Sequence, residues 1–153
     1  MEDFSTIKRN LYDYCCDFVD GKIKTSQQIL VSLKESASNE TKSSAGDKHE
    51  TGRAMMHLEQ EKNAKQLNEA LKLRQVLDRI DPAMYTDKIG LGSLVITDKG
   101  RFYFAVAAGK LSCEQKDYYA VSLSSPVANV FMGREVKDEV NFNGRSFRIE
   151  AIK

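Results

Sequence analysis

The chain has 153 residues, of which 41% are apolar, and this length holds one compact domain or two small units. Lysine and arginine total 23 against 22 for aspartate and glutamate, so the net charge excludes a general affinity for the phosphates of DNA. Any contact with nucleic acid is therefore expected to be local.

The three cysteines and the N-terminal residues indicate a cellular compartment. An odd number of cysteines, two of them adjacent, fits neither a disulfide framework nor the paired spacing of a zinc site, so a reducing environment is expected. The first residues lack the order of a signal peptide, and no later run reaches membrane-spanning length. We therefore expect a cytoplasmic monomer that has no membrane partner.

Residues 1–80 are predicted to form a helical hairpin, because they contain no proline and are rich in helix-forming residues. Apolar residues recur at helical spacing at Ile7, Leu11, Tyr14 and Phe18, and again at Leu30, Leu33 and Ala37. Gly21 lies where this stripe is interrupted, so the segment is either one long helix or two helices joined at a kink.

A second helix is predicted from Asp47 to Ile80. Gly46 suits the left-handed residue that ends a helix, and Asp47 suits the cap that begins the next one. The two helices would then form an antiparallel pair with an acidic tip at residues 45–50.

Residues 81–153 change in character and predict a small sheet. Aromatic and β-branched residues now form short runs separated by turn residues, which predicts strands at residues 93–97, 101–107, 118–123, 139–142 and 145–152. A loop is expected around Gly109, and Asn143-Gly144 predicts a hairpin turn. Ser125 and Pro126 are typical of the start of a short helix, which Gly133 would end. The predicted fold class is α+β, with an antiparallel sheet and one packed helix.

Three segments resemble the bacterial Gre transcript-cleavage factors. Gly46–Thr51 is similar to the family's tip pattern Gly-Asp-x-x-Glu-Asn. Ser124–Gly133 resembles its Ser-Pro-Leu-Gly-x-Ala-Leu-Leu-Gly helix, and Asp138–Val140 resembles its Gly-Asp-Glu-Val strand. The resemblance implies an N-terminal coiled-coil hairpin, residues 1–80, followed by an FKBP-like domain, residues 81–153.

The same resemblance implies a function in transcription elongation. In the family, the hairpin enters the secondary channel of RNA polymerase, and its tip carboxylates help to hold a magnesium ion with which the polymerase cuts backtracked RNA. Asp47 and Glu50 would take this role, because magnesium prefers oxygen ligands. The chain would bind no cofactor alone, would share magnesium with the polymerase in the complex, and would not itself be an enzyme.

The resemblance also implies further contact residues. The acidic pair is accompanied by three basic residues, Lys42, Lys48 and Arg53. These residues would contact either the phosphates of the nascent RNA 3′ end or the polymerase. The predicted docking residues of the second domain are Ser125, Pro126, Phe131 and Gly133.

Several departures from the family pattern leave alternatives open. Lys137 stands where the family has glycine, Ala128 replaces another glycine, and Ser43 and Thr51–Arg53 differ near the tip. A regulator that docks without stimulating cleavage is therefore the first alternative.

Other readings need no metal at the tip. Asp47 and Glu50 have the spacing of a capping box, in which both side chains bind backbone N–H groups. Solvated surface charge is the alternative explanation for Lys42 and for Arg53. Prolyl isomerisation and a coiled-coil adaptor are the remaining functional alternatives.

Overall fold

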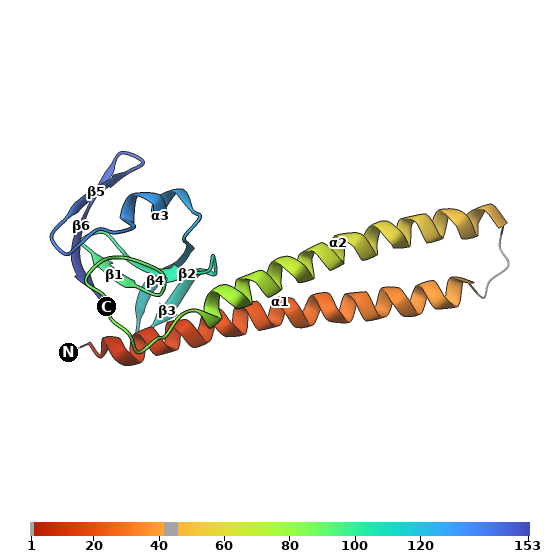
Figure 1. Cartoon of the computed structure of the whole chain (residues 1–153), viewed down its shortest axis with the longest axis horizontal. Coiled ribbons are helices and arrows are strands. Elements are labelled where there is room, and N and C mark those ends of the chain that lie inside the picture. The colour runs from red at the N-terminus through yellow and green to blue at the C-terminus, as the bar shows by residue number, and fades with distance from the viewer. Residues whose placement is uncertain (1, 42–45) are drawn as a thin grey trace. The chain divides into compact units, whose positions relative to one another are not determined.

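The computed structural model describes residues 2–41 and 46–153, without the side chains of residues 40, 41 and 46–49 (Figure 1). Two long helices come first, followed by six strands and one short helix. In chain order the elements are α1 (Phe4–Thr41), α2 (Gly46–Asp78), β1 (Leu94–Thr97), β2 (Arg101–Ala105), β3 (Gly109–Cys113), β4 (Lys116–Ser122), α3 (Pro126–Phe131), β5 (Glu139–Phe142) and β6 (Arg145–Ile152). The predicted α+β fold class is confirmed.

The chain forms two compact units. One, the sheet unit, comprises Met1–Phe18 and Gln75–Lys153, and the other, the arm unit, comprises Val19–Arg74. These limits differ from the change in composition near Asp81, so the division into domains of residues 1–80 and 81–153 stays a prediction. Among the described residues, no helix is both long and apolar enough to cross a membrane.

Helix α1 is continuous through Gly21, which decides between the two alternatives for this segment. A Cβ atom at Gly21 would meet nothing within 4 Å, so this glycine serves no close packing. The buried face at the start of α1 consists of residues spaced by four, namely Ile7, Leu11, Cys15 and Val19. Tyr14 of the predicted stripe is exposed instead.

Helix α2 begins at Gly46, so the prediction that this glycine ends the first helix is wrong. Its last residue is Asp78, two residues before the predicted end, and a difference of this size is usual at a helix boundary.

Two contacts join the helices within the units: the Tyr12 hydroxyl donates to the carbonyl of Leu77 at 3.1 Å, and Arg74 pairs with Asp20 at 3.4 Å.

Polar contacts fasten the first residues of the chain within the sheet unit. The Glu2 carboxylate accepts hydrogen bonds from Arg101, at 2.9 Å, and from Lys116. Lys8 is almost completely buried, and its ammonium donates to the carbonyl of Met84 at 2.5 Å. Burial lowers the pKa of Lys8, and the nearby Asp81 carboxylate opposes this shift. These contacts hold the start of α1 against β2, β4 and the segment after α2.

The six strands form one sheet in the order β3-β4-β2-β1-β6-β5. All neighbouring strands are antiparallel except β2 and β4, which are parallel, with Phe102 opposite Tyr119. The prediction of a purely antiparallel sheet is therefore wrong for this pair. A loop was expected around Gly109, but strand β3 lies there. The sequence does not indicate this strand because Leu111 is its only buried residue and its apolar alternation is weak.

Positive backbone φ angles mark the tight turns of the sheet unit. The predicted Asn143-Gly144 hairpin has φ angles of 51° and 75°, as a two-residue turn of type I′ requires. Lys137 has φ 80°, in the left-handed region that favours glycine. A glycine would adopt this backbone conformation without strain.

Replacing Lys137 by glycine is expected to stabilise the protein by about 1 kcal/mol, because a non-glycine residue in the left-handed region is strained. Lys137→Ala is the matched control: it removes the same side chain and keeps the strain. Urea unfolding should show a higher midpoint for Lys137→Gly alone. Equal midpoints for the two variants would contradict strain at this position.

Candidate functional site

Helix α3 is held at its start by Ser125. The Ser125 hydroxyl accepts a hydrogen bond from the N–H of Ala128 at 3.3 Å and donates to the carbonyl of Ser122 at 2.6 Å. Pro126 occupies the first turn, where its missing N–H leaves no bond unmade. The predicted cap, proline and helix are confirmed.

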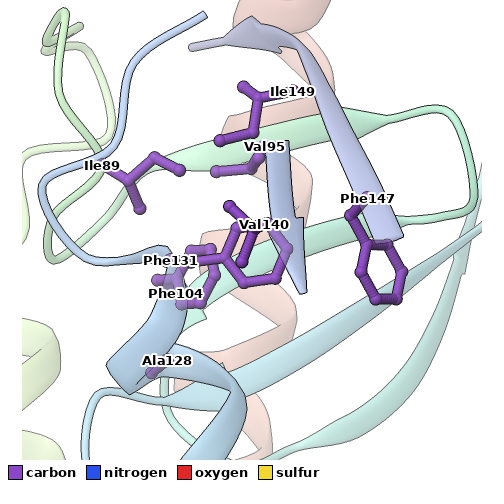
Figure 2. Close-up of a cluster of buried hydrophobic side chains, with 8 residues drawn as sticks. All are labelled: Ile89, Val95, Phe104, Ala128, Phe131, Val140, Phe147 and Ile149. Atoms are coloured by element: carbon purple, nitrogen blue, oxygen red, sulfur yellow. The ribbon is translucent and has the colours of Figure 1, made fainter. Parts of the chain in front are cut away.

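Phe131 at the end of α3 is fully buried in the core of the sheet unit (Figure 2). Its ring centroid lies 5.3 Å from that of Phe102, 5.9 Å from Phe104 and 5.8 Å from Phe147. These separations are typical of favourable tilted and edge-to-face ring contacts. The remaining buried members of this cluster are Ile89, Val95, Ala128, Val140 and Ile149.

A cleft of about 370 Å³ opens beside α3 on the same face of the sheet. Its apolar lining comes from four strands and from α3: Phe102, Tyr119, Val121, Val127, Phe142 and Phe147. Phe102 and Tyr119 are ring neighbours at 6.2 Å, and Tyr119 is 42% exposed. The volume is within the range of small-ligand and side-chain pockets.

The rim of the cleft is polar and positively charged. Lys99, Gly100, Asn143 and Arg145 complete its lining, from the β1–β2 and β5–β6 turns. The Lys99 ammonium donates to the carbonyl of Ser146, which holds this side chain beside the β5–β6 hairpin. The cleft therefore offers aromatic surface for an apolar group and two cations for a carboxylate, and its lining residues include no carboxylate, thiol or imidazole. This arrangement suits binding.

The predicted docking residues differ in accessibility. Pro126 and Gly133 are exposed and Ser125 is half-buried, whereas Phe131 is fully buried and can act only by supporting its neighbours. None of these four lines the cleft. Val127, next to Pro126, is the residue of α3 that does.

The acidic tip lies only partly within the described residues. Glu50 and Arg53, both in α2, have exposed side chains. Lys42 and the side chains of Asp47 and Lys48 lie outside the described residues. Among the side chains that are described, no three of His, Cys, Asp or Glu gather as a metal site. The role of the tip stays a prediction.

The sequence predicted the Asn143-Gly144 turn but not the cleft to which Asn143 contributes. The lining residues come from segments up to 48 positions apart, Lys99 and Phe147 being the extremes. Their convergence depends on the parallel pairing of β2 with β4, which places Phe102 beside Tyr119. No local pattern in the sequence signals that pairing.

Cys15, one of the adjacent cysteines, is completely buried. Burial, and to a lesser degree the neighbouring Cys16, raise the pKa of the Cys15 thiol from 9.0 to about 12. A thiol that stays protonated is a poor nucleophile, so Cys15 is a packing residue and does not suit redox sensing.

No protein-family model and no curated protein matches the chain. Among solved structures, the chain is similar to one described as "Structure of the transcription factor Gfh1", with 19% sequence identity and a TM-score of 0.34. The alignment covers 92% of this chain and 92% of that chain.

A variant with Cys16→Ser and Cys113→Ser retains Cys15 as its single thiol. We expect this thiol to resist an aromatic disulfide reagent at pH 8 in the native protein and to react in urea. The free energy of unfolding should also fall as pH rises from 9.0 to about 12, because the unfolded thiol ionises there while the folded thiol remains protonated. Rapid native labelling of Cys15 would contradict the burial.

Proposed function

We propose that this chain is a transcription factor that binds bacterial RNA polymerase, and that the cleft beside α3 is its docking surface. One observation carries the proposal. The segment Ser124–Gly133, which resembles the Ser-Pro helix of the Gre factors, contains α3, and Val127 of this helix lines an open aromatic cleft. The family-like motif and a surface suited to binding therefore coincide.

The lining of the cleft defines the chemistry of the docked segment. An apolar side chain of the polymerase would pack on Phe102 and Tyr119, and a neighbouring carboxylate would pair with Lys99 or Arg145. Exposed aromatic surface surrounded by charge is typical of interfaces with a small central anchor.

The hairpin tip would act within the polymerase. We propose that Asp47 and Glu50 supply oxygen ligands to a magnesium ion that the polymerase also holds, and such an ion activates water for phosphodiester hydrolysis. The exposed position of Glu50 on α2 suits a ligand for an ion held by another protein. Two carboxylates leave most of an octahedral shell unfilled, so the site would form only in the complex. Lys48, Arg53 and Lys42 would contact RNA phosphates or the polymerase.

Reversing the charge of Arg145 tests the docking surface. Arg145 and Phe147 line the cleft from β6. Arg148 is exposed on the opposite face of the same strand and does not line the cleft. We expect Arg145→Glu to weaken binding to purified core polymerase about ten-fold, corresponding to about 1.4 kcal/mol. Arg148→Glu, the matched control, should bind as the unmodified protein does. Equal affinities for the two variants would place docking elsewhere.

A cleavage assay on backtracked elongation complexes tests the tip. We expect the protein to accelerate RNA cleavage at low magnesium, and Asp47→Asn combined with Glu50→Gln to abolish this acceleration while binding to polymerase persists. If the unmodified protein binds polymerase without accelerating cleavage, the first alternative holds, and the chain is a regulator that docks without stimulating cleavage. If it does not bind, the proposed function is wrong.

A further inference from the structure

The arm unit has a buried seam that is partly polar. Its buried residues, among those that the structure describes, are Val19, Ser26, Asn63 and Ala70. Ser26 is 7% exposed and Asn63 is 5% exposed. Because this unit consists of segments of α1 and α2 alone, each helix provides the cover for the polar side chains of the other.

The positions of these residues follow the heptad spacing of a coiled coil. Ser26 lies seven residues after Val19 in α1, and Asn63 lies seven residues before Ala70 in α2. Seven residues make about two helical turns, so each polar residue occupies the same helix face as the apolar residue one heptad away. In an antiparallel pair both steps lead toward the tip. Ser26 and Asn63 are thus the buried positions one heptad nearer the tip than Val19 and Ala70, and the two polar residues are together called here the polar layer.

Beyond the polar layer the two helices are poorly matched. The next seam positions of α1 carry the half-buried residues Leu30, Leu33 and Ala37. The half-buried positions of α2 over the same stretch are Gln60, Met56 and Gly52. The α1 side of this stretch is apolar, whereas the α2 side contributes one apolar side chain, Met56, so little apolar surface is available to hold this part of the pair together.

The amide nitrogen of Asn63 bonds within its own helix. It donates to the carbonyl of Glu59 at 2.9 Å, one turn away in α2. This hydrogen bond lies within α2 and does not join α2 to α1. A polar residue in a helix seam lowers the stability of the paired state, which makes the polar layer the weak point of the seam.

We infer that the polar layer is a built-in breakpoint, at which the segments 27–39 of α1 and 50–62 of α2 separate as one cooperative unit while the Val19–Ala70 layer stays paired. Local opening of this kind is a general property of segments with few buried apolar contacts. A partner that binds the open and paired states with different affinity would shift this equilibrium. The inference concerns the free protein and does not depend on the proposed function.

Hydrogen–deuterium exchange of the intact protein, without any partner, tests the breakpoint. We expect amides in residues 27–39 and 50–62 to exchange at one common rate, and those in residues 15–22 and 67–74 to exchange at least ten-fold more slowly. A gradual increase in exchange rate toward the tip, with no step at the polar layer, would overturn the inference.

Asn63→Leu should slow exchange in residues 27–39 and 50–62 about ten-fold, because it replaces the buried amide by an apolar side chain. Asn68→Leu is the matched control, since Asn68 is exposed on the same helix; it should leave the step in place. Far-UV circular dichroism would verify that both variants keep their helices. An unchanged step in Asn63→Leu, or the same slowing in both variants, would show that the polar layer does not determine the opening.

Discussion

The packing of Phe131 among Phe102, Phe104 and Phe147 is the constraint on which the rest of the sheet unit depends. It fixes the end of α3 on the sheet, while Ser125 fixes the start of the helix through its cap. With both ends held, Val127 lies at the edge of the cleft rather than in the core. The aromatic cluster thus serves two purposes: its buried side stabilises the fold, and its outer side, formed by Phe102 and Phe147, lines the cleft.

Elements with strong local signals were predictable from the sequence. The Ser-Pro start of α3, the Asn-Gly turn and the long helices depend on interactions between residues close in the chain, and they occur as predicted. Strand β3 was missed because its side chains alternate weakly, and it exists through pairing with β4. The parallel pairing of β2 and β4 is equally non-local. Lys137 shows a further limit, since a lysine gives no local indication of its left-handed backbone.

The candidate site was predictable in part. Motifs identified α3 and the acidic pair, but the cleft depends on which face of each strand is covered, and Phe131 proved to be core rather than surface. The arm unit was also predictable only in part. Apolar residues of α1 gave a stripe that is interrupted near Gly21, and the character of the seam also depends on which residues of α2 lie in it, which include Asn63 and Gln60.

The central claim is that the cleft contacts bacterial RNA polymerase, and site-specific photo-crosslinking tests it most directly. A photoreactive phenylalanine analogue would replace Tyr119 in the cleft or, as a control, Arg148 on β6 outside the cleft, and each protein would be irradiated with purified core polymerase. The account predicts a crosslink to a polymerase subunit from position 119 and none from position 148. Absence of a crosslink from position 119, or equal crosslinks from both positions, would contradict it.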